Sequence, residues 1–213
     1  MEIKFTLVVI CFLLALSHKS RWLNERDWLL LVLAMAFTVG ADFFLTILFN
    51  YPVGVAVFCF AHVFYAFRYG GNRVWRFFPL ALPLPITLLI LTGEPLLVVS
   101  SLYAGLFVIS LTTAIRTLAT KKYPAPNNVL VVAGMGLFVI CDVFVAIFNL
   151  VGMGFIANHA LGEFAVDAIW LFYAPAQICL ALSGTKFARK KPTSLCPSSL
   201  SPPLDACPSS SSQ

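Results

Sequence analysis

The chain has 213 residues, of which 60% are hydrophobic and 11% are charged, and its mean hydropathy is +0.92. An average soluble domain has about 25% charged residues, so this composition excludes an ordinary water-soluble protein and indicates a multi-pass membrane protein. The net charge of +5 calls for no nucleic-acid partner, because a collar of basic residues on the inner face of a membrane accounts for it.

Seven apolar segments are predicted to form helices. In chain order they are residues 2–17, 28–49, 52–68, 77–92, 95–116, 128–150 and 164–184. Residues 96–115 form an uncharged run of 20, which is about the length that an α-helix needs to cross the hydrocarbon core. The predicted fold class is therefore all-α, a polytopic membrane helix bundle with seven transmembrane helices within residues 1–191.

The basic residues predict how this bundle is oriented. All but Lys4 of the 14 lysines and arginines follow the first, third, fifth and seventh segments, and the other connections contain none. The positive-inside rule then places the N-terminus outside and the C-terminus in the cytosol.

Two segments have a second interpretation. Residues 1–17 resemble a secretory signal peptide, and residues 77–92 contain Pro79, Pro83 and Pro85, which would suit a re-entrant segment. Removing either segment as a span would move basic connections to the outer side. We therefore predict a short spanning helix for the first and a kinked spanning helix for the second.

The composition changes after Lys191. Residues 192–213 are dominated by Ser and Pro and are predicted to form a disordered cytosolic tail. Four of the six cysteines lie in apolar segments and two in this tail, without the spacing of metal ligands or of a disulfide framework. No metal and no cofactor are expected.

Two carboxylates interrupt the apolar segments. Asp42 lies in "VGADFFLTILFN" and Asp142 lies in "VICDVFVAIFN". Both helices are predicted to run outward, and at 1.5 Å per residue the two aspartates reach nearly the same depth in the outer half of the membrane. An Asp at the centre of a spanning helix costs about 2.5 to 3.5 kcal/mol, so two at one level favour a functional interpretation.

Other polar side chains are predicted at that level. His62 and Tyr173 lie on helices that run inward, Tyr65 follows His62 at a spacing of three, and Gln177 follows Tyr173 at a spacing of four. The helix of Asp42 carries a polar residue at every fourth position, namely Thr38, Asp42, Thr46 and Asn50. Tyr103 and Trp170 are interpreted as packing residues.

The sequence also contains a weak internal echo. "DFFLTILFN" from Asp42 is similar to "DVFVAIFN" from Asp142, and "VFYA" ending at Ala66 is similar to "LFYA" ending at Ala174. Parallel repeats of this kind occur in small transporters.

Four short motifs carry a family resemblance. They are Ala41-Asp42, "AHVFY" from Ala61, Cys141-Asp142 and "YAPAQ" from Tyr173. In order, spacing and helix placement they resemble the motifs of the YhhN-like integral membrane family, which includes the lysoplasmalogenases of the transmembrane protein 86 type. Ala41 stands for the family's Gly, Cys141 for its Ser and Ala174 for its second Tyr. Family members often have eight helices.

This resemblance implies hydrolysis of the vinyl ether bond of lysoplasmalogens, with a lysophospholipid substrate drawn from the membrane lipid. Such chemistry needs a protonated carboxylic acid and a second carboxylate, and two buried neighbouring carboxyl groups push their pKa values apart. We expect Asp42 and Asp142 to be the acid and the base, without assigning which is which, and His62 and Tyr173 to orient water or the glycerol oxygen. The substrate-binding residues expected from this interpretation are Tyr65, Gln177, Thr46 and Asn50.

Two other classes remain as alternatives. A small parallel-repeat solute transporter would suit seven helices and the internal echo. Against it, the first, second, fifth and sixth segments lack the prolines expected to break transport helices, and Pro175 lies in the last segment. A seven-helix receptor or retinal protein is the other, but the last segment has no interior Lys for a Schiff base. The sequence leaves open whether the chain forms a homodimer.

Overall fold

The computed structural model describes residues 2–17, 24–154 and 156–186, with side chains from Phe5 onward. Its elements are all helices, which confirms the all-α class. In chain order they are α1 (Glu2–Ser17), α2 (Glu25–Thr46), α3 (Tyr51–Gly70), the 3-10 helix η2 (Gly71–Ala81), α4 (Pro83–Leu91), α5 (Pro95–Thr120), α6 (Asn127–Gly152) and α7 (His159–Leu182). The tail predicted at residues 192–213 lies outside the described residues.

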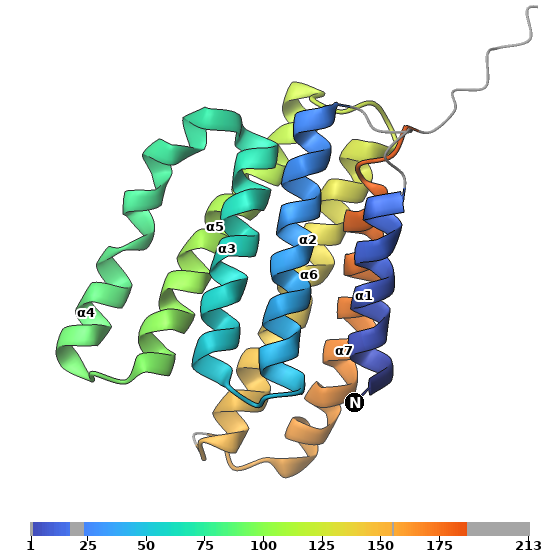
Figure 1. The fold of residues 1–213 in the computed structure, drawn as a ribbon. Coiled ribbons are helices and arrows are strands. Elements are labelled where there is room, and N and C mark those ends of the chain that lie inside the picture. The colour runs from blue at the N-terminus through green and yellow to red at the C-terminus, as the bar shows by residue number, and fades with distance from the viewer. Residues whose placement is uncertain (1, 18–23, 155, 187–213) are drawn as a thin grey trace, which may run out of the picture.

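Within the part of the chain that the structure describes, five helical stretches are long and apolar enough to cross a membrane. They are Glu25–Thr46, Tyr51–Leu91, Pro95–Thr120, Asn127–Gly152 and His159–Leu182. Figure 1 shows the chain running alternately up and down, with α3 rising and the η2–α4 segment descending within the longest of these stretches. The chain is a multi-pass membrane protein, while the count of seven spans and the orientation of the termini stay predictions.

The segment predicted as one kinked helix consists of two helices. The 3-10 helix η2 contains Pro79, and α4 begins at Pro83, where the missing N–H of proline costs no helical hydrogen bond. At a rise of about 2.0 Å per residue for η2 and 1.5 Å for α4, the two helices together extend roughly 35 Å. They are therefore long enough to cross a hydrocarbon core of about 30 Å as one broken segment.

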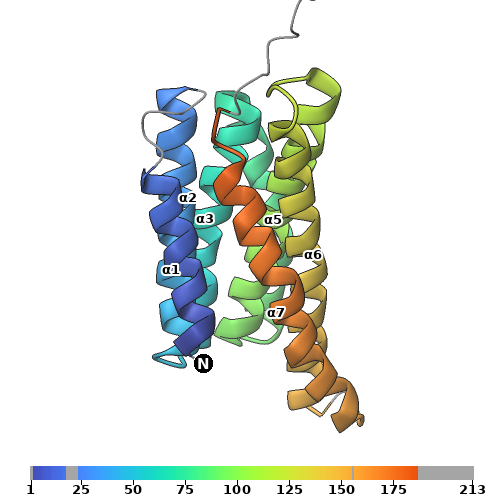
Figure 2. The ribbon, with the colours of Figure 1, turned by 90° about the vertical axis from the view of Figure 1, so that its right-hand side faces the viewer.

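The short first helix packs into the bundle. Figure 2 shows α1 lying beside α2 and α7, and its side chains Val8, Cys11 and Ala15 are buried there. Its described apolar part, Phe5–Ser17, is shorter than the five long stretches. The helix predicted at residues 2–17 is present, while its crossing of the membrane stays a prediction.

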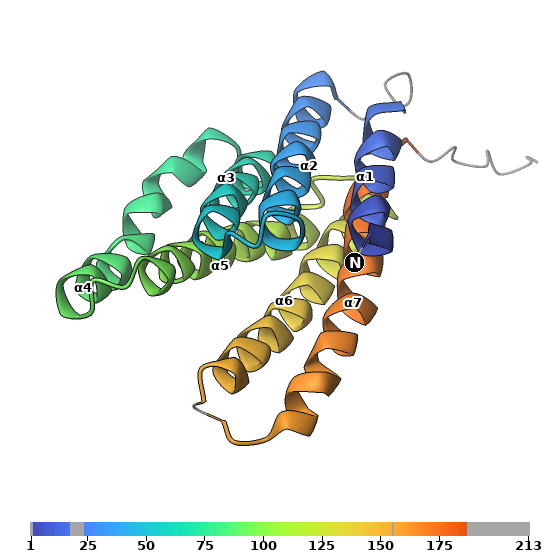
Figure 3. The same cartoon turned by 60° about the horizontal axis from the view of Figure 1, so that its bottom comes forward.

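Large apolar side chains cover the outer surface of the bundle. On and beside α4, which Figure 3 shows at the far edge from α1 and α7, Leu80, Ile90 and Leu91 are 72%, 78% and 73% exposed. The interior contains many small and aromatic residues instead, such as Ala34, Ala41 and Phe138. Apolar surface on this scale needs lipid around it.

A buried ion pair joins the helices at the end where the basic residues gather. Arg68, at the end of α3, donates to both carboxylate oxygens of Asp27 on α2, at 3.1 and 3.0 Å. Its third donor reaches the Ser183 hydroxyl beyond α7 at 2.8 Å. Tyr123, in the α5–α6 connection, donates to Asp27 at 2.6 Å, and burial raises the pKa of this phenol, so it keeps its proton. Four parts of the chain therefore depend on one guanidinium.

Replacing Arg68 by Ala should destabilise the fold strongly. The Arg68 side chain is fully buried, and its removal leaves the Asp27 carboxylate without its cation, which costs about 3 to 5 kcal/mol for a buried pair. Arg76→Ala removes the same charge from an exposed position and serves as the control. Thermal unfolding of both variants in detergent measures the difference, and equal midpoints would contradict the structural importance of this ion pair.

The predicted orientation has a direct test. In sealed vesicles whose interior corresponds to the cytosol, an impermeant maleimide should label Cys196 and Cys207 only after the membrane is opened, because the tail is predicted to be cytosolic. Glu94→Cys, in the exposed α4–α5 connection, should be labelled without opening. The reverse labelling pattern would show that the bundle is inverted.

Candidate active site

Asp42 is a buried carboxyl group near the end of α2. The residue is 5% exposed, and the hydroxyl of Tyr173 on α7 donates to its Oδ2 at 2.6 Å. Gly54 on α3 lets α3 approach α2 closely beside Asp42, since a Cβ at that position would lie 3.2 Å from the carbonyl oxygen of Ala41 on α2. The structure therefore brings together two of the four predicted catalytic residues.

Asp142 on α6 has an equivalent partner that the sequence reasoning missed. The hydroxyl of Tyr103 on α5 donates to its Oδ2 at 2.6 Å, and Asp142 itself is half-buried. The interpretation of Tyr103 as a packing residue was therefore incomplete. Its depth was the available signal, because Tyr103 lies eight residues after Pro95, roughly 12 Å into the helix and close to the predicted polar layer.

The two carboxyl groups belong to one neighbourhood. Their tyrosine partners, Tyr173 and Tyr103, are connected through ring contacts with Phe138 and His62. Asp42 lies four residues from the end of α2 and Asp142 ten residues from the end of α6, roughly 6 and 15 Å. The α6–α7 hairpin extends further than the α2–α3 hairpin, as Figure 1 shows, and this compensates for the different distances of the two aspartates from their helix ends.

Aromatic rings pack between the polar groups. The Phe138 ring lies 5.4 Å from the Tyr173 ring and 5.6 Å from the imidazole of His62. The His62 ring is also 5.0 Å from the Tyr103 ring and 4.5 Å from the Phe107 ring. His62 thus borders the carboxyl–tyrosine pairs through ring contacts, and its described hydrogen bond goes elsewhere.

The hydrogen bond of His62 indicates its tautomer. Nδ1 lies 2.9 Å from the hydroxyl of Ser110, and that hydroxyl donates to the carbonyl of Phe107 at 2.9 Å. A hydroxyl has one hydrogen, so Ser110 accepts from His62 and Nδ1 carries the proton. Nε2 is then a lone-pair acceptor, and it has no hydrogen-bond partner within the described part of the chain.

The remaining predicted residues fall into two groups. Tyr65 and Gln177 are fully buried, and the hydroxyl of the first and both amide atoms of the second lack hydrogen-bond partners among the described residues. Thr46 donates to the carbonyl of Asp42 at 2.6 Å, and exposed Asn50 caps α3 by accepting from the Val53 N–H. The first group is available to a ligand or water, while the second is bonded to backbone.

No group of three His, Cys, Asp or Glu side chains suited to a metal ion occurs in the residues that the structure describes. The two carboxyl groups instead share a hydrogen-bonding pattern with the phenols. Within the same residues each Asp accepts a phenol bond at Oδ2 only, so Oδ1 of each group can hold or accept a proton.

The internal echo does not extend to these hydrogen bonds. Tyr65 corresponds to Tyr173 in the repeated sequence, and a symmetric arrangement would pair Tyr65 with Asp142. Tyr103 occupies that position instead. The structure gives the repeat no support at the level of the site.

The fold and the site define a multi-pass membrane protein with a pair of tyrosine-bonded carboxyl groups in its interior. The chain belongs to the YhhN family, whose family model matches residues 1–184. The resemblance carried by the four short motifs is therefore confirmed, and α1 is part of the family region. Comparison with curated proteins and with solved structures gave no match.

Proposed function

We propose that the chain is a membrane hydrolase that cleaves the vinyl ether bond of lysoplasmalogens. In this reaction water adds across the bond, and the products are a fatty aldehyde and a glycerophosphoethanolamine or glycerophosphocholine. Membership of the YhhN family supports a lysoplasmalogenase-like protein. The reaction itself is proposed from the chemistry of the site.

The observation that carries this proposal is the doubled carboxyl–phenol arrangement. Asp42 and Asp142 come from different helices, each accepts a hydrogen bond of 2.6 Å, and the rings of Phe138 and His62 connect their tyrosine partners. Acid–base catalysis needs one group that donates a proton and one that accepts a proton, and two carboxyl groups can supply both roles. A single buried carboxyl group would serve equally well as a structural tie.

The proposed steps use one carboxyl group as acid and the other as base. The acid protonates the vinyl carbon β to the ether oxygen, which leaves an oxocarbenium ion. The ionised carboxylate stabilises this cation and takes a proton from the attacking water, which gives a hemiacetal. When the hemiacetal collapses, the second carboxyl group returns that proton to the alcohol oxygen as the C–O bond breaks. The hemiacetal hydroxyl gives its own proton to the first carboxylate and becomes the aldehyde oxygen, so both carboxyl groups return to their starting states.

The unpartnered buried groups are the proposed contacts for water and glycerol. Nε2 of His62 can accept a hydrogen bond, and Gln177 can both donate and accept. An unpaired buried polar atom costs about 1 to 3 kcal/mol, so these atoms should gain from a bound hydroxyl group. Tyr65 offers a further hydroxyl. Thr46 acts on the site only through the backbone of Asp42.

Asp42→Asn and Asp142→Asn should each abolish aldehyde release. Loss of a positioned acid or base reduces a rate by about 10² to 10⁴-fold, and an amide can replace neither. Purified protein is assayed with a lysoplasmalogen beside the ester lysolipid of the same head group. Asp167→Asn, at an exposed position of α7, is the matched control and should keep full activity.

Wild-type turnover retained by both variants would remove this mechanism. Solute uptake by liposomes that hold the protein, without any lysolipid turnover, would favour a transporter instead. The two aspartate variants should be correctly folded, because Asn keeps the shape of the side chain and can still accept from the phenol.

Tyr103→Phe and Tyr173→Phe should reduce the rate without abolishing it. Each removes one hydrogen bond to a carboxyl group and keeps the ring contacts, which predicts a loss of roughly tenfold. The pH–rate profile is the decisive readout, because each variant should move a different limb. The limb that moves with Tyr173 reports on Asp42, and the other on Asp142. An unchanged rate and pH profile for Tyr103→Phe would show that Tyr103 has only a packing role.

A further inference from the structure

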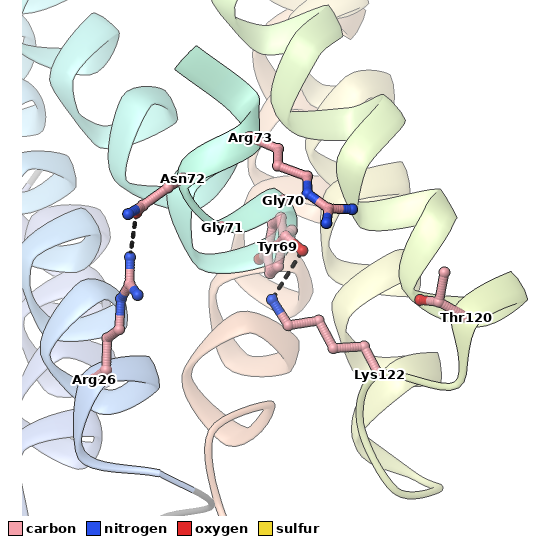
Figure 4. Close-up of a pocket in the computed structure, with 8 residues that line it drawn as sticks. All are labelled: Arg26, Tyr69, Gly70, Gly71, Asn72, Arg73, Thr120 and Lys122. Atoms are coloured by element: carbon pink, nitrogen blue, oxygen red, sulfur yellow. Dashed lines mark hydrogen bonds between the residues drawn. The ribbon is translucent and has the colours of Figure 1, made fainter. Parts of the chain in front are cut away.

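A cavity of about 590 Å³ opens at the basic end of the bundle, far from the two carboxyl groups. Figure 4 shows its lining, which comes from the start of α2, the junction of α3 with η2 and the end of α5 with the following turn. Arg26 at this end is sixteen residues before Asp42 on the same helix, roughly 24 Å along the axis. The cavity is therefore separate from the candidate active site.

Three cations, Arg26, Arg73 and Lys122, line this cavity, and its described lining residues include no carboxylate. Asp27 lines the adjoining cavity, where Arg68 and Tyr123 already occupy its carboxylate. The positive charge of the lining is thus left to solvent or to a bound anion.

Neutral groups hold two of these cations in place. The ammonium of Lys122 donates to the carbonyl oxygens of Arg68 and Tyr69 at 2.6 and 2.9 Å, and Arg26 donates to the side-chain oxygen of Asn72. Burial lowers the pKa of Lys122, Asp27 partly offsets this effect, and Arg68 and Arg26 add to it. The cations are therefore positioned but not neutralised, and an anion would relieve their mutual repulsion.

The turn beside these cations leaves room for a ligand. Gly71 begins η2 with φ of +64°, and a Cβ added there would meet no described atom within 4 Å, so this turn is open. The Gly71 N–H donates to the carbonyl oxygen of Phe67, so the donors that the cavity offers to an anion are the side chains of the three cations.

We propose that this cavity binds a phosphate group, carried either by a membrane phospholipid or by a soluble phosphate compound. Two guanidinium groups and one ammonium can surround the oxygens of a phosphate with charge-assisted hydrogen bonds. The position at the end of the spanning helices places the cavity at head-group level, and the predicted orientation puts it on the cytoplasmic side.

Arg73→Gln and Arg76→Gln form a matched pair for the test. Both arginines are exposed on η2, and only Arg73 lines the cavity. Neither takes part in the Arg68–Asp27 ion pair, so both variants should fold. The full chain is studied in two arms, in detergent with inorganic phosphate, and in phosphatidylcholine nanodiscs with or without phosphatidate. The midpoint of thermal unfolding is measured in each arm.

Inorganic phosphate, phosphatidate or both should raise the midpoint of thermal unfolding of the wild-type chain. Arg73→Gln should weaken the apparent affinity roughly tenfold, because one charge-assisted contact is lost, and Arg76→Gln should leave it unchanged. A response to phosphatidate alone assigns a lipid ligand, and a response to inorganic phosphate assigns a soluble one. No response in either arm, or equal weakening by both variants, would overturn the proposal. Aldehyde release does not enter this test, so its outcome is independent of the proposed hydrolase.

Discussion

Hydrogen bonding of carboxyl groups away from water is the constraint on which the interior of this protein depends. A buried carboxyl group without a partner costs several kcal/mol in hydrocarbon, so each one requires a donor from another helix. Tyr173 supplies the donor for Asp42 and Tyr103 supplies it for Asp142. These bonds connect α2 with α7 and α5 with α6, so the groups proposed for chemistry also hold the helices in register.

At the basic end of the bundle a carboxylate is satisfied by a cation instead of by a phenol alone. Asp27 is neutralised by Arg68 and hydrogen-bonded by Tyr123, and the described lining of the 590 Å³ cavity contains cations but no carboxylate. The bundle therefore has a region of acidic groups in its interior and a region of cations at one end. A lipid lying along the outside of the bundle would meet exposed Leu and Ile side chains.

Prediction from sequence was accurate where local composition decides the structure. Apolar runs must be helical in a membrane, because every backbone group needs an internal partner, and the helix positions followed from this rule. The fourth segment differed, since Pro79 and Pro83 divide it into a 3-10 helix and an α-helix. Arg68 also differed. Its charge suggested an exposed collar, yet it is buried because Asp27 lies opposite it on another helix.

The sequence by itself determined that the protein folds in a membrane, that it is helical, which family motifs it carries and that Asp42 and Asp142 lie inside apolar segments. Only the tertiary structure decided which side chains meet. Helix periodicity gives the depth of a residue but not its lateral neighbours, and so Tyr103 was missed while Thr46 and Asn50 were assigned to substrate although their hydrogen bonds go to backbone. Lateral pairing depends on how far each hairpin extends and how each helix is rotated, and both are set by packing between helices that are distant in the chain.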